Sequence, residues 1–265
     1  MYKILDAHCH IYPDKIAQKA SDATGKFYDM VPLMDGTVST LISEGEKAGF
    51  SHFVVQSVAT TPHQVSSINR FVSEIVKNSG GKMTGLGTVH PDSENQEADI
   101  LELISLGLKG VKLHPDIQNF KMDDYRMLKI YELCEKHKLP VLMHCGDSRF
   151  DRSNPNRLVP ILDIYTDLIV IGAHFGGYSV WEDAIQKLSE YKNFYVDTSS
   201  SLFAVSRDDA KRFINAYGVD KVMFGTDYPL WSPKEEIERF MRLDLSEEER
   251  RKILFDNAAR LLGIE

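Results

Sequence analysis

Two histidines near the start of the chain, His8 and His10, have the spacing of metal ligands on a strand. They end the stretch Leu5-Asp6-Ala7-His8-Cys9-His10, in which apolar residues lead into polar ones. Because strand side chains alternate with a period of two, both imidazoles point to the same face. Two neutral imidazoles side by side can hold one divalent ion. A His-x-His pair alone is weak evidence, since such pairs also arise by chance.

Four later apolar runs also end in residues of the ligand type, which strengthens the case for a metal site. They are Val111-Lys112-Leu113-His114, Val141-Leu142-Met143-His144, Val170-Ile171-Gly172-Ala173-His174 and Met223-Phe224-Gly225-Thr226-Asp227. Strands of a parallel sheet are buried on both faces and therefore read as continuous apolar runs. Sites in such sheets lie beyond the carboxyl ends of the strands, where these side chains would gather.

The elements between these runs predict a closed barrel. Eight strands alternate with helical segments from Leu5 to about Gly225, with strands predicted at 52–57, 83–89, 109–114, 140–144, 168–173, 193–196 and 221–225. This count favours a single (β/α)8 barrel, an α/β fold of one domain over residues 1–265, rather than an open sheet. Only the closed barrel brings the first, fifth, sixth and eighth strands around one axis.

Two further segments complete the predicted architecture. Residues 11–36 form a long insertion between the first strand and its return helix, with a short helix over 14–23 that Gly25 closes. This insertion either covers the barrel mouth for packing or contacts the substrate. Ser179, Ser232 and Ser246 each precede a glutamate by three residues and predict capping boxes. Residues 246–264 are expected to form C-terminal packing helices.

The strand ends supply a complete set of donors for one divalent metal. The predicted ligands are His8, His10, His144 and Asp227. Three nitrogens and one carboxylate oxygen suit zinc first, with iron, cobalt or manganese as alternatives. Bound water would have its pKa lowered to about 7, and Asp227 would accept its proton as general base. The competing interpretations are a hydrogen-bonded mouth residue for His144 and a turn residue for Asp227.

Other polar side chains at the predicted barrel mouth are candidates for catalysis or substrate binding. His174 would act as an acid/base or oxyanion partner, or complete a second metal site, so one ion or two remain open. Lys112 points the same way as His114 and could be carboxylated to bridge two metals, hold a substrate carboxylate as an ammonium, or be neutralised by acidic neighbours. Arg149, in the loop after the fifth strand, is a candidate for binding a substrate carboxylate. Lys112, His114 and Arg149 are therefore the predicted substrate-binding residues.

Composition narrows the class of protein. The 265 residues carry a net charge of −8, with 43% hydrophobic and 26% charged residues, as in a soluble globular protein. The acidic balance and the lack of a Lys/Arg cluster argue against a nucleic-acid partner. We expect no signal peptide and no membrane span, and therefore a cytoplasmic location. The three cysteines are too few for a disulfide framework. The sequence leaves a homo-oligomer open.

The motifs together resemble the amidohydrolase superfamily, in its amidohydrolase 2 branch of metal-dependent barrel hydrolases and decarboxylases. The resemblance is carried by Asp6-Ala7-His8-Cys9-His10, Gly110-Val111-Lys112-Leu113-His114-Pro115, Pro140-Val141-Leu142-Met143-His144, Ala173-His174-Phe175-Gly176-Gly177 and Phe224-Gly225-Thr226-Asp227-Tyr228-Pro229. It implies that the four predicted ligands bind a catalytic divalent metal and that His174 lies near the reacting group.

Three functions follow as hypotheses. The first is a hydrolase of a small amide, lactone or ester that uses metal-activated water. The alternative is a metal-dependent nonoxidative decarboxylase of a small unsaturated or aromatic acid, in which Lys112 or Arg149 holds the carboxylate. The third is a barrel without chemistry, which the presence of acid, base and ligand types disfavours.

Overall fold

The computed structural model describes residues 2–265, which contain nine strands that all pair in parallel. The strands are β1 (Leu5–His10), β2 (His52–Gln56), β3 (Met83–Gly85), β4 (Gly87–Thr88), β5 (Val111–Leu113), β6 (Val141–Met143), β7 (Val170–Gly172), β8 (Phe194–Asp197) and β9 (Val222–Met223). Each strand pairs with the next one along the chain, within one sheet of β1 to β3 and another of β4 to β9.

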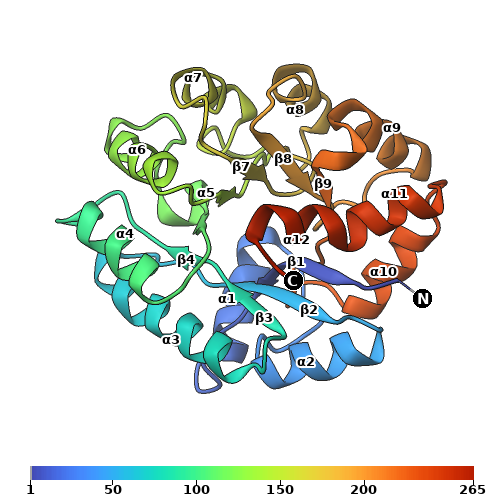
Figure 1. Cartoon of the computed structure of the whole chain (residues 1–265), viewed down its shortest axis with the longest axis horizontal. Coiled ribbons are helices and arrows are strands. Elements are labelled where there is room, and N and C mark those ends of the chain that lie inside the picture. Colours follow the sequence, from blue (N-terminus) through green and yellow to red (C-terminus); the bar gives the residue numbers. More distant parts are fainter. Residues whose placement is uncertain (1) are drawn as a thin grey trace.

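Two junctions join these sheets into a ring. β3 and β4 are one strand interrupted at Leu86, whose N–H still donates to the carbonyl of Val55 on β2 at 3.0 Å. At the other edge, the Ala7 N–H donates to the Phe224 carbonyl at 2.9 Å, which ties β1 to the segment after β9. Eight strands therefore surround one axis, and the predicted (β/α)8 barrel is confirmed (Figure 1).

Helices surround the barrel because each return segment carries one apolar face. The return helices are α2 (Val38–Lys47), α3 (Val65–Asn78), α4 (Gln96–Ser105), α6 (Leu128–Lys136), α7 (Val159–Ile164), α8 (Trp181–Leu188), α9 (Arg207–Tyr217) and α10 (Pro233–Met241). Single 3₁₀ turns are η1 (Pro62–Gln64), η2 (Tyr125–Met127), η3 (Pro155–Arg157) and η4 (Val219–Lys221). No helix within residues 2–265 has both the length and the apolar character needed to cross a membrane.

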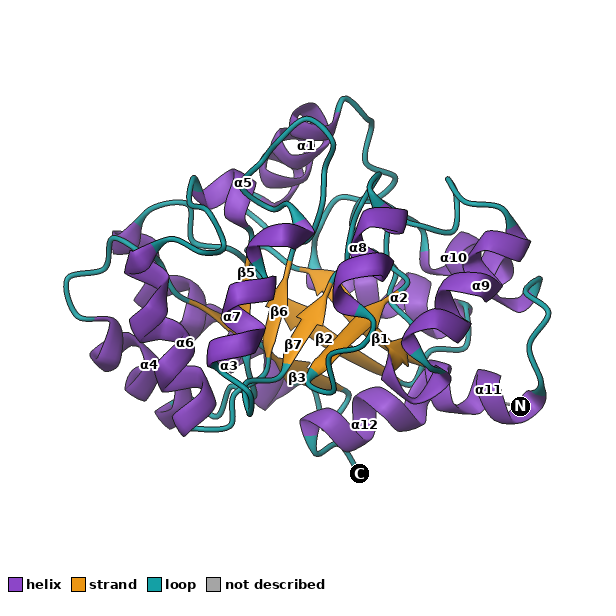
Figure 2. Cartoon of the chain, turned by 90° about the horizontal axis from the view of Figure 1, so that it is seen from above, coloured by secondary structure: helices purple, strands orange, loops and turns teal. Residues whose placement is uncertain are grey.

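The remaining helices lie beyond the two ends of the barrel (Figure 2). They are α1 (Ala17–Tyr28) in the long insertion, α5 (Pro115–Gln118) after β5, and the C-terminal series α11 (Glu247–Arg251), the π-helical turn η5 (Lys252–Asp256) and α12 (Asn257–Leu262). Ala258 and Leu262 of α12 join the apolar cluster inside the barrel, together with Val54, Leu142 and Ile171. α12 therefore closes the end opposite α1.

The insertion helix differs from its predicted bounds. α1 runs to Tyr28 and ends at Asp29, which takes a left-handed φ of 55°, so the prediction that Gly25 closes a helix over 14–23 is wrong. Gly25 is buried inside the helix, where an added Cβ would lie 2.5 Å from the Met30 carbonyl oxygen and 2.5 Å from Pro32. Glycine is required here because the chain folds back closely onto the helix.

The three predicted capping boxes have different outcomes. The box at Ser246 is confirmed, and its hydroxyl accepts the N–H of Glu249 at 3.2 Å. Ser232 directly precedes α10 but its side chain makes no capping hydrogen bond. The box at Ser179 is wrong, because its φ of 59° is not the extended backbone of an N-cap and its hydroxyl accepts the Ser148 N–H instead.

Candidate metal centre and substrate cavity

A bulge in β1 orients the first histidine pair. Asp6 pairs with Phe53 on β2, but Cys9 pairs with Val55, so β1 contains one extra residue between these two pairs. The bulge shifts the alternation of side chains, and Ala7 and His8 both face the inside of the barrel. Cys9 packs in the outer core, and the imidazoles of His8 and His10 face one cavity.

Asp6 holds this bulge against the segment that carries Asp227. Its buried carboxylate accepts the His8 N–H at 3.1 Å, the Thr226 N–H at 2.9 Å and the Thr226 hydroxyl at 2.6 Å. Burial raises the pKa of Asp6 to about 6, although these hydrogen bonds oppose the rise. Gly225 permits the close approach of the two segments, since a Cβ there would lie 3.0 Å from the Cβ of His8.

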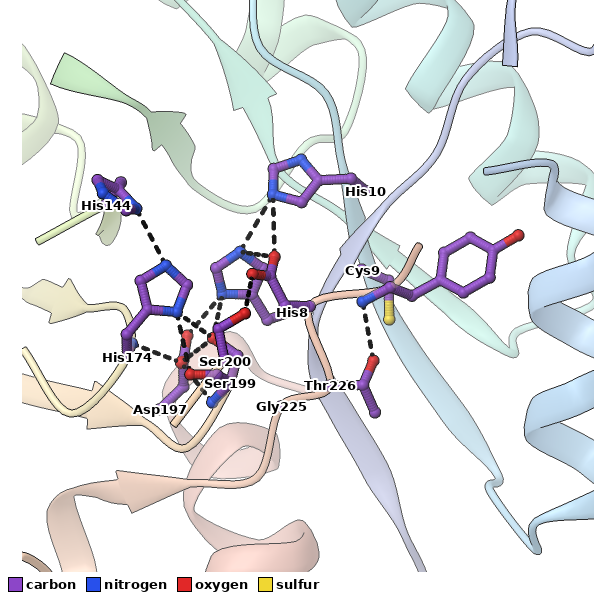
Figure 3. Close-up of polar contacts among 12 residues, drawn as sticks. His8, Cys9, His10, His144, His174, Asp197, Ser199, Ser200, Gly225 and Thr226 are labelled. Carbon is purple, nitrogen blue, oxygen red and sulfur yellow. Dashed lines mark hydrogen bonds and ion pairs between the residues drawn. The ribbon is translucent and has the colours of Figure 1, made fainter. Parts of the chain in front are cut away.

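Three of the four predicted ligands meet in space. His8 Nε2 lies 3.2 Å from His10 Nε2 (Figure 3). Asp227 Oδ1 lies 3.4 Å from His8 Nε2 and 3.6 Å from His10 Nε2. Donors bound tetrahedrally at about 2.0–2.2 Å are about 3.3–3.6 Å apart, so these separations match a zinc-sized ion. The side chains present therefore fit a divalent metal.

The protonation of these groups also suits a cation. Burial lowers the pKa of His10 well below its usual value, which keeps the imidazole neutral. Burial alone would raise the pKa of Asp227, but the surrounding imidazoles, of which His8 has the largest effect, outweigh it and hold the pKa at about 2. Neutral imidazoles and an ionised carboxylate are the forms that bind metals.

Asp197, at the end of β8, orients His8 and was missed in the sequence. Its Oδ2 accepts the His8 Nδ1–H at 2.8 Å, and both side chains are fully buried. This contact places the ring proton on Nδ1 and leaves the lone pair of Nε2 free for an ion. The missed signal was the same one that identified His114 and His144, because Phe194-Tyr195-Val196-Asp197 is also an apolar run that ends in a residue of the ligand type.

His144 lies in the same cavity but apart from the other three predicted ligands. Its Nδ1 is 3.0 Å from His174 Nε2, and its ring stacks on His114 with centroids 4.0 Å apart and an interplanar angle of 7°. Asp116, which completes a second group of donors with these two stacked histidines, has Oδ2 3.6 Å from His144 Nε2. Lone pairs of parallel rings lie in separate planes, so one ring must turn before both can bind a common ion. A role for His144 as ligand stays a prediction.

Lys112 lies beside the ligand group. Its Nζ is 3.0 Å from His8 Nε2, and the side chain is buried. Burial lowers the pKa of Lys112 to about 8, while Asp227 and Asp197 oppose this shift. An ion at His8 would compete with this contact, so the amine would lose its proton or turn to an anion.

The cavity above these residues has a volume of about 180 Å³. Its wall combines strand-end side chains with residues of the insertion. The insertion contributes Tyr12, Ala20, Ala23, Thr24 and Tyr28. Of the two interpretations of the insertion, the structure supports the one in which it forms part of the cavity rather than a cover for packing alone.

Tyr28, on α1, was missed as a site residue. Its hydroxyl lies 2.7 Å from His114 Nε2 and 3.4 Å from His144 Nε2. Burial raises the pKa of Tyr28 well above its usual value, so the phenol stays neutral and can donate a hydrogen bond. The only signal in the sequence was its position in a long insertion.

Arg149 contacts the last turn of the insertion helix α1. It pairs with Asp147 at 2.7 Å, and its Nη1 donates to the Phe27 carbonyl at 3.0 Å. Its guanidinium also lies over the rings of Phe27, Tyr28 and Phe150, at 5.1–5.5 Å from their centroids. The described cavity wall includes Lys112 and His114 but not Arg149.

Comparison with known proteins gives a family match over nearly the whole chain. The family model described as Amidohydrolase matches residues 5–264. A curated relative, the 2-amino-3-carboxymuconate-6-semialdehyde decarboxylase of Dictyostelium discoideum, is 23% identical over an alignment of 246 residues, and the match covers 75% of this chain and 66% of that protein. The chain thus spans about two thirds of that relative.

Solved structures share the fold. A TIM-barrel protein of Bordetella bronchiseptica has a TM-score of 0.82 at 24% identity over 98% of each chain. The 5-carboxyvanillate decarboxylase of Sphingomonas paucimobilis has a TM-score of 0.78 at 17% identity over 100% of each chain. Matches also include a protein assigned as a 2-pyrone-4,6-dicarboxylic acid hydrolase from Pseudomonas putida (21%, TM-score 0.73) and a manganese-bound 5-carboxyvanillate decarboxylase from Novosphingobium aromaticivorans (15%, TM-score 0.77), each covering 97% or more of both chains.

Proposed function

Because the chain belongs to the amidohydrolase family, we propose that it is a metal-dependent enzyme that removes carbon dioxide from a small carboxylic acid. The substrate class is an unsaturated or aromatic acid. The curated relative and the Sphingomonas structure are both decarboxylases, which supports this function over the hydrolysis that the sequence alone favoured.

The observation that carries the proposal is the excess of polar nitrogen groups over carboxylates in the cavity wall, as far as the described residues show it. Five histidines and Lys112 line it, against a single carboxylate, Asp227. Groups that donate hydrogen bonds or carry positive charge attract an anionic substrate, and a charged hydrogen bond contributes about 1.5–3 kcal/mol. A cavity of about 150 Å³ in another protein holds benzene, so a volume of about 180 Å³ suits an acid with one ring.

The metal would be held by His8, His10 and Asp227, with His144 as the further predicted ligand. Both zinc and manganese suit this mixture of nitrogen and oxygen donors, and manganese is present in the Novosphingobium relative. A bound divalent ion polarises substrate oxygens and orients the substrate. One ion fits the three donors that meet in this structure.

Side chains of this protein would bind the substrate carboxylate and transfer the proton. Lys112 holds the substrate carboxylate, whose bond to the adjacent carbon breaks as carbon dioxide leaves. The electron pair stays on that carbon, which then takes a proton that comes from the solvent and is passed on by His174. His174 faces the cavity for this proton transfer, and its ring is fixed by the Ser199 carbonyl, which lies 3.0 Å from Nδ1. The enclosing wall from α1 excludes water from the reacting carbon.

Carbon dioxide release tests the proposal. We expect purified protein with Mn²⁺ or Zn²⁺ to release carbon dioxide from members of a panel of unsaturated and aromatic acids, and chelation to abolish it. Lys112→Met should lower kcat/KM by about 10- to 100-fold, because a charged hydrogen bond is lost. Lys211→Met serves as the matched control, since that lysine pairs with Glu249 on the outside of the barrel. Full activity after chelation would contradict the proposal.

Hydrolysis remains a second candidate because one matched structure is assigned as a hydrolase of a pyrone dicarboxylic acid. In this reaction Asp227 would accept the proton of the attacking water. Turnover of lactones or amides with net addition of water and no carbon dioxide would favour this candidate over decarboxylation.

A further inference from the structure

A short chain of hydrogen bonds links Asp227 to the outer rim of the barrel. The Ser200 hydroxyl lies 2.5 Å from Asp227 Oδ2, and the indole Nε1–H of Trp231 lies 2.9 Å from the Ser200 oxygen. Ser200 belongs to the loop after β8, and Trp231 to the segment between β9 and α10. Figure 3 shows Ser200 directly beside the cluster of ligands.

The chemistry of the three groups determines which group donates and which accepts in each of these two hydrogen bonds. An indole N–H can only donate a hydrogen bond, and an ionised carboxylate can only accept one. The Ser200 hydroxyl must therefore donate its proton to Asp227 while it accepts the N–H of Trp231. No alternative assignment satisfies both neighbours.

The consequence for Asp227 is that its two oxygens have different roles. Oδ2 is engaged by Ser200, while Oδ1 lies 3.4 Å from His8 Nε2 and 3.6 Å from His10 Nε2. The carboxylate therefore presents one oxygen to the ligand group. Without Ser200, rotation of the carboxylate would exchange the two oxygens or offer both.

The surroundings hold this arrangement in place. Ser200 is buried and takes a φ of 45°, a left-handed conformation that a serine adopts only when neighbouring contacts maintain it. The Trp231 ring stacks on Phe203 with centroids 4.3 Å apart, and the Arg239 guanidinium lies 5.3 Å from its centroid. These two contacts hold the indole, whose N–H points to Ser200.

We propose that Ser200 and Trp231 are positioning residues that set Asp227 to bind the metal through Oδ1 alone. The proposal rests on the metal site put forward above. Hydrogen bonds that orient a metal ligand typically change metal affinity by about 10- to 100-fold when they are removed.

Metal affinity tests this role without recourse to activity. Titration of metal-free protein with Mn²⁺ by calorimetry should show about 10- to 100-fold weaker binding in Ser200→Ala and weaker binding in Trp231→Phe. Ser200→Gly keeps the left-handed backbone without strain and also lacks the hydroxyl, so it should bind Mn²⁺ as weakly as Ser200→Ala. Ser73→Ala is the control, because it removes another buried hydroxyl, which donates to the Leu106 carbonyl on the outside of the barrel. Unchanged affinity in Ser200→Ala would overturn the proposal.

Tryptophan fluorescence gives a second readout. The chain has two tryptophans: Trp231 is linked to the Asp227 carboxylate through Ser200, whereas the Trp181 N–H donates to the backbone carbonyl of His174 at 3.0 Å. Mn²⁺ should change the emission of the wild type and of Trp181→Phe but not of Trp231→Phe. The opposite pattern would refute the role of Trp231. Wild-type protein that binds no metal would instead refute the proposed function, so the two failures are distinguishable.

Discussion

At the scale of single residues, the buried carboxyl group of Glu236 should make stability depend on pH. Burial raises its pKa from 4.5 to about 7, although Arg239 opposes the rise. Between pH 4.5 and pH 7 the folded state binds more protons than the unfolded state. The free energy of unfolding therefore falls as pH rises through this range, and the whole destabilisation by Glu236 is present above pH 7. Glu236→Gln should therefore be more stable than wild type by about 3 kcal/mol at pH 8 and nearly equal below pH 4.5.

Urea denaturation at pH 4.5 and pH 8 measures this difference. Glu235→Gln is the matched control, because Glu235 contacts the same arginine at 3.1 Å but is exposed. It should show no comparable dependence on pH. An equal stability of Glu236→Gln and wild type at pH 8 would show that Glu236 stays ionised at no cost.

At the scale of elements, Arg149 connects the insertion helix α1 to the loop after β6. Its hydrogen bond to the Phe27 carbonyl and its contacts with three aromatic rings hold the last turn of the helix. Each such cation–π contact contributes about 0.5–1 kcal/mol at a partly exposed site. Arg149→Met should therefore speed amide hydrogen exchange in Ala17–Tyr28 by about tenfold and leave the barrel strands unchanged.

Hydrogen exchange with mass spectrometry resolves the two regions. Arg212→Met is a suitable control, since Arg212 also combines ion pairs with a ring contact, to Phe213, but lies on α9. It should not change exchange in α1. Equal exchange in Arg149→Met and wild type would mean that packing of α1 alone closes the cavity, whereas weaker substrate binding with unchanged exchange would favour the direct clamp predicted from the sequence.

At the scale of the whole molecule, the residues that stabilise the inner core and the residues of the candidate site lie at opposite ends of the barrel. Leu262 of α12 packs in the inner apolar cluster at one end, while the candidate site occupies the other. Leu262→Ala should lower the free energy of unfolding by about 2–4 kcal/mol, because it opens a cavity in this cluster. Metal affinity at 25 °C should stay as in wild type, since Leu262 is not among the residues that line the cavity of the candidate site.

Denaturation curves and metal titrations on the same samples check this separation. Ile164→Ala is the control, because that side chain is 63% exposed and its loss should change stability by less than about 0.5 kcal/mol. A parallel loss of metal affinity in Leu262→Ala would show that the two ends of the barrel are coupled.

The sequence alone determined the barrel and the strand-end positions of His8, His10 and Asp227. These depend on apolar runs, helix starts and alternation, which are properties of neighbouring residues. The rule that parallel strands end at one edge then brings distant residues together without further information. The prediction of a helix over 14–23 was wrong because glycine at position 25 is required by the close approach of Met30 and Pro32, and not to end the helix.

Only the tertiary structure decided which side chains meet and how they are oriented. The bulge in β1 depends on pairing with β2, and the contact of Asp197 with His8 joins residues 189 positions apart. The direction of Arg149 toward α1 and the chain from Trp231 to Asp227 likewise depend on the packing of separate loops. Hydrogen bonds and ring contacts act over a few ångströms, so their partners are fixed only when the whole barrel has closed.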